Sequence, residues 1–310
     1  MHGFTDDPLI QQVVSSDGRG GDLLTRAEHQ FTGFKKEYGK NYPTEEEEDY
    51  RFGVFMSNLR KARRNQIIDP TATYGVTMFS DLTPSEFRSQ YLSSNQHIHL
   101  PNNLTKLAPI LSTDDLPTTF DWRDKGQCGS CLAFSSIAAL ETANFLANEE
   151  LVVLSEQQLV DCSKECTQDK RVCNKGCTSG SHILAYNYMT NVGIEQAKYY
   201  PYTATDTGSC KFDKNKIVAK LHGHKVIVPN EDQYKANLVK FGVIAVAINE
   251  NMMQDYKGGV MCPPCTGDFI NLNHGVALVG YGSRWLGEQH WIIKNSWGKK
   301  LWRGWILQAL

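Results

Sequence analysis

The residues best suited to chemistry are a cysteine, a histidine and an asparagine that lie far apart in the chain. Cys131 opens an apolar run, His274 lies 143 residues downstream, and Asn295 follows soon after His274. A thiol at the start of a helix meets the positive end of the helix dipole, which favours the thiolate. A thiolate nucleophile needs a base and a third group that orients the base. We therefore predict a catalytic triad with Cys131 as nucleophile, His274 as base and Asn295 as orienting residue.

Other interpretations of the same cysteine remain open. Cys131 could belong to a disulfide, and the pairs Cys128-x-x-Cys131 and Cys262-x-x-Cys265 have the spacing of zinc or redox sites. These two pairs are too far apart for a compact zinc ribbon, and the Asn-His-Gly and Asn-Ser-Trp contexts favour the triad. We therefore expect neither a metal nor another cofactor. The remaining eight histidines have no distinguishing context and receive no role.

A helix and two strands must position the triad. The stretch Cys131–Leu146 is apolar and rich in alanine, which predicts a buried central helix. Short apolar runs bounded by glycine or asparagine predict strands at Val243–Ile248, Gly275–Tyr281 and Trp291–Lys294. His274 enters the second of these strands and Asn295 ends the third. Both side chains could therefore face the helix N-terminus across a cleft.

The first third of the chain predicts two packed helices. The first is expected over about Thr25–Tyr38, where aromatic residues recur at helical spacing. The second follows Pro43, with Thr44 as its N-cap and Glu47 completing a capping box. Ser155 opens a second capping box, which predicts another helix further along the chain.

Composition predicts the domain boundaries. A short strand and a turn are expected over Tyr74–Asp81. Residues 88–116 then mix polar residues and proline without periodicity, which indicates an exposed linker and an activation cleavage site. Cysteine, glycine and tryptophan become frequent after it. We therefore expect a helical domain at 26–87, a linker at 88–116 and a second domain at 117–310.

Bulk properties argue against several classes of partner. The net charge of −2 gives no reason to expect nucleic acid. The sequence has no run of 18 apolar residues, so we expect no membrane span. Nine cysteines favour an oxidising compartment, although the first residues lack the pattern of a signal peptide. We therefore expect a secretory route, with the leader missing from this chain.

Together these motifs resemble the precursors of papain-family cysteine proteases, most of all the cathepsin F-like vacuolar proteases that plants induce on dehydration. The resemblance covers nearly the whole chain, and its combined motifs are highly specific. In the first third it is carried by Glu47, Arg51, Phe55, Asn58, Gly75, Thr77, Phe79 and Asp81. In the second domain it is carried by Asp121-Trp122-Arg123, the Cys131 box, Ser155–Cys162, Leu272–Gly282 and Trp291–Gly298.

The resemblance implies an α+β fold, a papain-like two-lobe peptidase with a helical left lobe and a β-barrel-like right lobe, preceded by a helical inhibitory propeptide. It implies that Cys131 attacks a peptide carbonyl, that His274 protonates the leaving amine, and that Trp297 shields the bond between His274 and Asn295. The implied substrates are proteins and peptides. The implied molecule is a monomer of the vacuole or lysosome, or secreted, whose propeptide is an intramolecular inhibitor removed on acidification.

The resemblance also assigns binding residues and disulfides. Gly180 is expected to bind substrate backbone, while Leu272 and Gly275 are expected to shape a pocket for an apolar side chain. The family pattern implies the disulfides Cys128–Cys177 and Cys162–Cys210. Two further cysteine pairs are left for which a bridge is one option, namely Cys166 with Cys173 and Cys262 with Cys265.

Some positions depart from the family pattern. A short segment between Gly126 and Gln127 is missing, so Lys125 stands where the family has the glutamine of the oxyanion hole. Loss of one such donor typically costs about 10²–10³ in rate. Leu132 replaces an aromatic residue, Thr178-Ser179 replaces Asn-Gly, and the chain stops before the last strands of the family. The alternative hypothesis is therefore a catalytically impaired homologue that acts as a peptide-binding or inhibitory protein.

Overall fold

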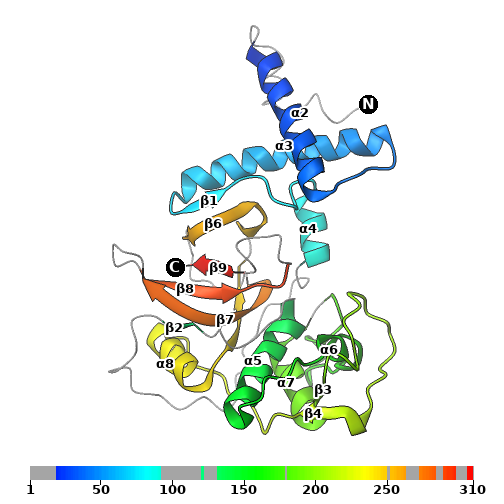
Figure 1. Ribbon diagram of the computed structural model, residues 1–310, viewed down its shortest axis with the longest axis vertical. Helices are drawn as coiled ribbons and strands as arrows, with labels where there is room; N and C mark the ends of the chain where they lie inside the picture. Colours follow the sequence, from blue (N-terminus) through cyan, green and yellow to red (C-terminus); the bar gives the residue numbers. More distant parts are fainter. Residues whose placement is uncertain are drawn as a thin grey trace. The chain divides into compact units, whose positions relative to one another are not determined.

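The computed structural model describes residues 19–91, 120–121, 131–178, 180–249, 252–262, 272–283, 289–297 and 306–309. The chain divides into two compact units. The first unit comprises residues 1–87 together with 252–257, and the second comprises 88–251 together with 258–310. Figure 1 labels the elements of both units along the colours of the sequence.

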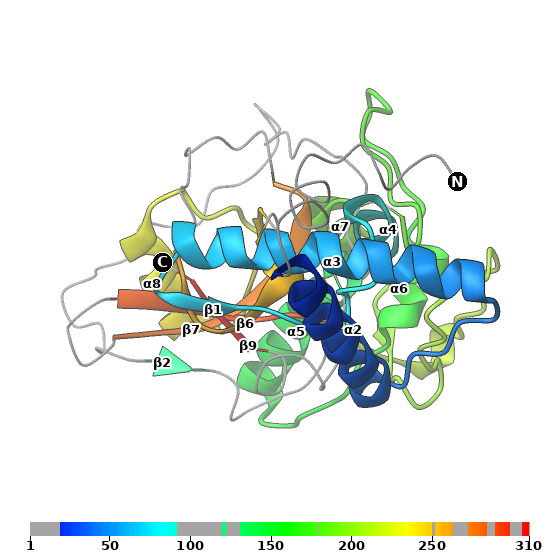
Figure 2. The ribbon, with the colours of Figure 1, turned by 90° about the horizontal axis from the view of Figure 1, so that it is seen from above.

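The first unit is built on two crossed helices, α2 (Arg19–Tyr38) and α3 (Glu45–Ile68) (Figures 1 and 2). Thr44 caps α3, since its side-chain oxygen accepts a hydrogen bond from the backbone N–H of Glu47 at 3.2 Å. The core between the helices is aromatic and consists of Phe31, Phe34 and Phe55, with Phe52, Tyr38 and Tyr42 packed around it. The predicted pair of packed helices is therefore confirmed.

Short elements complete the first unit. They are β1 (Ala72–Tyr74), the start of α4 (Pro84–Tyr91) and the 3₁₀ helix η3 (Met253–Asp255). The predicted short strand and turn over Tyr74–Asp81 are both present, but the strand lies earlier than expected and ends at Tyr74. The chain turns there because the Gly75 N–H donates to the Asp255 carbonyl, and hydrogen bonds close turns from Thr77 to Leu82.

The second unit contains a group of helices around a hydrophobic core. Its main helices are α5 (Cys131–Asn148), α6 (Glu156–Cys162) and α7 (His182–Asn191), with the 3₁₀ helix η2 (Lys214–Lys216) and the small sheet of β3 (Ile194–Glu195) and β4 (Ile217–Ala219) beside them. The most buried members of this core are Ile137, Leu140, Leu154, Ala185, Met189 and Ile194. The predicted central helix is therefore present; its middle is buried as expected, whereas Leu146 near its end is exposed.

The large sheet of the second unit has a central long strand, β7 (His274–Ser283). Both β5 (Ile244–Ile248) and β2 (Phe120–Asp121) pair with it, and β8 (Gln289–Lys294) pairs with its other edge. Beyond β8 come β9 (Ile306–Ala309), antiparallel, and then β6 (Tyr256–Met261), which is parallel to β9. The predicted strands match β5, β7 and β8 to within two residues at each end.

Helix α5 joins the sheet to the helical part of this unit. Ala138 of α5 packs with Ala277, Val279 and Ile292 of β7 and β8 in a second buried cluster. Small residues at these positions let the helix lie close to the strands. The α8 helix (Glu231–Phe241) precedes β5. Because α5 carries Cys131 and β7 begins at His274, this packing brings the two predicted reactive residues toward one another.

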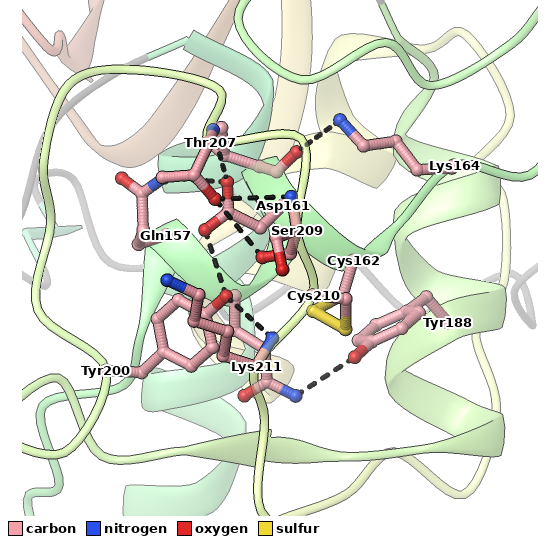
Figure 3. Close-up of a disulfide and its surroundings, with 12 residues drawn as sticks. Gln157, Asp161, Cys162, Lys164, Tyr188, Tyr200, Thr207, Ser209, Cys210 and Lys211 are labelled. Carbon is pink, nitrogen blue, oxygen red and sulfur yellow. Dashed lines mark hydrogen bonds between the residues drawn. A yellow bond between two sulfur atoms is a disulfide. The ribbon is translucent and has the colours of Figure 1, made fainter.

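Two disulfides hold the helical part together, of which the first was expected from the family pattern and the second was one option left open by the sequence. Cys162 is bonded to Cys210, and Cys166 to Cys173. Figure 3 shows the first bridge beside Asp161, whose carboxylate accepts hydrogen bonds from the Thr207 N–H and the Tyr200 hydroxyl, each at 2.9 Å. This network anchors the long loop that carries Cys210 to the end of α6.

Of the two cysteines of the expected Cys128–Cys177 bridge, the structure describes Cys177 alone. Cys177 is a free thiol, and desolvation of its sulfur raises its pKa. The bridge between Cys128 and Cys177 was expected from the family pattern alone and not from the spacing of the cysteines. Cys128 and Cys265 lie outside the described residues, and so do Lys125, Gln127 and nearly all of the predicted linker at 88–116.

Two searches of the described ranges bear on membranes and metals. None of the helices found there combines the length and the apolar character that a membrane crossing needs. Within the same ranges no group of three or more His, Cys, Asp or Glu side chains is arranged to hold a metal ion.

Candidate active site

Cys131 is the first residue of α5 and remains a half-buried thiol. The first turn of the helix is tied by Ser135, whose hydroxyl donates to the Cys131 carbonyl oxygen at 2.7 Å. The backbone N–H groups at a helix start point toward the N-terminal end and carry partial positive charge. The fold thus places the sulfur where an anion is stabilised, as the sequence predicted.

His274 and Asn295 are buried partners. His274 is the first residue of β7, and Asn295 directly follows the last residue of β8. The antiparallel pairing of these strands brings His274 Nε2 to 2.8 Å from Asn295 Oδ1. Residues that are 21 positions apart in the chain therefore form one hydrogen-bonded pair.

The tautomer of His274 follows from a second hydrogen bond to the same oxygen. The backbone N–H of Ser296 donates to Asn295 Oδ1 at 2.8 Å. A backbone N–H can only donate, so the atom of Asn295 at this place must be the amide oxygen and not its nitrogen. The oxygen can only accept, so His274 Nε2 carries a hydrogen. This leaves Nδ1 as the ring nitrogen that can take a proton from a thiol.

Trp297 covers the His274–Asn295 pair. Its ring is stacked on the imidazole, with centroids 4.7 Å apart and planes inclined by 26°. The Trp297 indole N–H donates to the carbonyl of Tyr91 at 3.2 Å, which fixes the indole in place. Exclusion of water strengthens the covered hydrogen bond, because the local dielectric constant falls.

One hydrogen bond joins the cysteine to the strand that carries the histidine. The backbone N–H of Gly275 donates to Cys131 Sγ at 3.4 Å, a normal distance for a sulfur acceptor. Gly275 immediately follows His274, so the start of α5 and the start of β7 meet at the sulfur. A donor directed at sulfur favours the thiolate. The structure therefore gathers the predicted Cys131, His274 and Asn295 into one site of the second unit.

The predicted binding residues lie around this site. A Cβ atom on Gly180 would stand 2.2 Å from Leu132 Cδ2 and 2.7 Å from Asn174 Oδ1, so a larger residue there would force these two side chains to move. Leu272 is half-buried, two residues before His274.

Sequence reasoning missed two buried titratable residues of the second unit. Glu141 of α5 accepts a hydrogen bond from the Leu154 N–H at 2.9 Å, and burial raises the pKa of Glu141 to about 8. His182, the first residue of α7, has its Nε2 atom 2.8 Å from Ser135 Oγ, and desolvation lowers its pKa to about 4. Nothing in the local sequence distinguishes either residue, because their neighbours come from distant parts of the chain.

Comparison with known families matches two separate parts of the chain. Residues 116–307 match the papain family cysteine protease, and residues 31–87 match the cathepsin propeptide inhibitor domain. Curated relatives include the probable cysteine protease RD19C of Arabidopsis thaliana, 49% identical over 93% of this chain and 81% of its own length. Cysteine proteinase 15A of Pisum sativum is also 49% identical, over 95% of this chain and 84% of its own length.

Solved structures show the same architecture. The recombinant stem bromelain precursor superposes with a TM-score of 0.76 and 27% identity, covering 92% of each chain. The digestive procathepsin L 3 of the Tenebrio molitor larval midgut superposes with a TM-score of 0.73 and 29% identity, covering 91% of this chain and 93% of that one. The predicted α+β papain-like fold is thus confirmed, and the chain belongs to the papain family of cysteine proteases as a precursor with an inhibitory propeptide domain.

Proposed function

We propose that this chain is the zymogen of a cysteine endopeptidase whose catalytic residues are Cys131, His274 and Asn295. The observation that carries the proposal is the pair of hydrogen bonds at the junction of α5 and β7. His274 Nε2 meets Asn295 Oδ1 at 2.8 Å, and the N–H of the next residue donates to Cys131 Sγ at 3.4 Å. One bond orients the base, and the other joins the sulfur to the residue that follows the base in the chain.

Cys131 and His274 serve the bond-forming and proton-transfer steps of the reaction. The Cys131 thiol gives its proton to His274 Nδ1, and the thiolate attacks the peptide carbonyl carbon to form a C–S bond. When the tetrahedral species collapses, the C–N bond breaks and the imidazolium gives its proton to the leaving amine. Water then attacks the thioester carbonyl carbon, with the imidazole accepting its proton, and the C–S bond breaks. The acid product leaves, and the imidazolium returns its proton to the sulfur to restore the thiol.

Substrate is held by residues next to the nucleophile. Gly180 offers backbone without a side chain beside Leu132, and the close packing there supports a binding role for its peptide groups. Leu272 and Gly275 flank His274 and border the place where an apolar substrate side chain binds. Proteins and peptides are the substrates.

The zymogen is activated by removal of its propeptide. The domain at 26–87 acts as an intramolecular inhibitor, and cleavage within 88–116 releases a monomeric peptidase at 117–310. The two disulfides support an oxidising location, which is the vacuole or lysosome or the cell exterior.

A thiol-directed irreversible peptide probe tests the proposal. The full chain and a Cys131→Ala control are expressed and acidified, and labelling is located by mass spectrometry. The expected result is a label on Cys131 in the acidified protein and none in the control. Equal labelling of the two proteins would remove the enzyme hypothesis, since Cys177 and Cys262 would then account for the reaction.

A further inference from the structure

We propose that His182 is a positioning residue, which holds the start of α5 against the start of β7 and so sets the place of Cys131 Sγ relative to His274. The inference rests on the proposed cysteine protease function. His182 belongs to α7, a third element that carries none of the triad. Its imidazole reaches both elements that do carry the reacting pair.

The first contact runs through Ser135 to the backbone of the nucleophile. His182 Nε2 lies 2.8 Å from Ser135 Oγ, and Ser135 Oγ lies 2.7 Å from the Cys131 carbonyl oxygen. The hydroxyl has a single hydrogen, and carbonyl oxygens can only accept. With that hydrogen donated within the helix, His182 Nε2–H is the donor to Ser135. A hydrogen-bonded chain therefore leads from α7 to the first residue of α5.

The second contact is with the strand that begins at the base. A Cβ atom built on Gly275 would stand 3.3 Å from both Cε1 and Nε2 of His182, and 3.4 Å from the Cα of Leu132. The imidazole therefore lies directly on the backbone of Gly275. That backbone donates its N–H to Cys131 Sγ. The carbonyl and the sulfur of the nucleophile are thus each held by a group that contacts His182.

Burial keeps this imidazole neutral. Desolvation lowers the pKa of His182 to about 4, so above that pH the ring has one N–H and one acceptor nitrogen. The aromatic ring of Tyr186, one turn along α7, has its centroid 6.4 Å from that of His182. A neutral ring fills space between α5 and β7, and its one N–H group donates a single hydrogen bond. These two properties can be separated by substitution.

His182→Leu retains the bulk but removes the donor, and His182→Gln retains an Nε2–H donor. We expect His182→Leu to lower kcat about tenfold, the effect of one hydrogen bond worth about 1.4 kcal/mol, with KM changed less than about threefold. His182→Gln should recover most of the loss. Ser135→Ala should reproduce the effect of His182→Leu, and the double variant should be no worse than either alone.

The pH profile separates positioning from mere folding. The rate of Cys131 alkylation by iodoacetamide is followed on the Cys131 peptide by mass spectrometry. This rate reports how much of the Cys131 thiol is ionised in the folded protein. We expect its acid limb to move to higher pH in His182→Leu and Ser135→Ala, and to stay in His182→Gln. The matched control is His224→Gln. His224 is a partly buried histidine with a lowered pKa whose ring centroid lies 5.5 Å from that of Tyr186, and its replacement should leave the profile unchanged.

Each outcome decides a different question. If wild-type Cys131 reacts no faster than Cys177, the proposed function fails. If the wild type is active and both His182→Leu and Ser135→Ala retain its kcat and its profile, the positioning role is overturned. If His182→Leu does not fold, the comparison of Ser135→Ala with His182→Gln decides, since the role requires a shift in the first and none in the second.

Discussion

A single amide oxygen organises the base at the scale of one residue. Asn295 Oδ1 accepts the His274 Nε2–H and the Ser296 N–H, both at 2.8 Å. The backbone donor fixes the amide, and the amide fixes the imidazole. An uncharged oxygen orients the ring without adding a full negative charge to it, which suits a base whose partner is itself an anion.

Asn295→Ala removes this acceptor and leaves His274 free to rotate or change tautomer. We expect kcat/KM to fall about 10²-fold. This loss is at the upper end of that usually seen for a residue that orients a metal-binding histidine, and it is smaller than the loss for the triad carboxylate of a serine protease. Steady-state hydrolysis of a peptide substrate measures the change. Asn148→Ala, at an exposed position of the same unit, is the control. An unchanged rate in Asn295→Ala would contradict the orienting role.

Glu141 gives the second unit a pH-dependent stability. Burial raises its pKa from an ordinary 4.5 to about 8, so the folded state binds the proton more tightly than the unfolded state. Its contribution is fully present below about pH 4.5 and is lost as the pH rises through about 8. Below a pH of about 8 the folded protein therefore keeps this carboxyl protonated, and the carboxyl still accepts the hydrogen bond from the Leu154 N–H.

Glu141→Gln should remove that slope, because the amide cannot ionise and its oxygen can still accept from Leu154. At pH 8 we expect the variant to be more stable by on the order of 2 kcal/mol, and near pH 4.5 to equal the parent. Urea unfolding at both pH values, in a Cys131→Ala background that prevents self-cleavage, measures the difference. Parallel pH dependence in both proteins would show that Glu141 is not the group responsible.

At the scale of elements, two helix caps of the same kind are buried to different extents. Thr44 caps α3 at an exposed position through the Glu47 N–H. Ser155 caps α6 in full burial: its oxygen accepts from the Gln158 N–H at 3.0 Å, and its hydroxyl donates to the Tyr200 carbonyl at 2.7 Å. The buried cap therefore serves two backbone groups that water cannot reach.

Ser155→Ala should consequently cost more than Thr44→Ala. We expect about 1 kcal/mol for the exposed cap and about 2–3 kcal/mol for the buried one, since the Tyr200 carbonyl also loses its partner. The shift of the urea midpoint for each variant, converted with a common slope, measures both costs. Equal losses would mean that burial of the cap contributes nothing.

At the scale of the whole molecule, the first unit joins segments that are distant in the sequence. Gln254 donates to the carbonyls of Phe79 and Leu82 at 3.2 and 2.9 Å, and Thr77 donates to its carbonyl at 2.7 Å. Asp255 lies beside it, and burial raises its pKa to about 6. The stabilisation that comes from protonated Asp255 is fully present below about pH 3.8 and is lost as the pH rises through about 6. Acidification therefore does not weaken the packing around Asp255.

Gln254→Ala should loosen the propeptide in the zymogen. It removes two donors to buried carbonyls, and we expect propeptide removal after acidification to become about tenfold faster, which corresponds to about 1.4 kcal/mol. A gel time course of the full chain at fixed pH measures the rate. Lys235→Ala, on α8, is the control variant. A rate equal to that of the wild type would place the controlling contacts elsewhere in the first unit.

Local sequence signals determined the elements of this protein, and for physical reasons that act over short distances. The apolar run after Cys131 becomes α5, Thr44 and Ser155 cap helices, and the apolar runs near His274 and Asn295 become β7 and β8. Capping and amphipathic burial depend on residues a few positions apart, so they can be predicted from the order of residues. The combined motifs of the family likewise indicated the triad.

The tertiary structure alone decided which groups surround the triad. The turn after Tyr74 depends on Asp255, the neutral state of Glu141 depends on its burial, and the place of His182 depends on Ser135 and Gly275. These partners come from distant segments, and desolvation depends on the packing of the whole unit. No local pattern records them, because the energy of such a contact exists only once the elements have packed together.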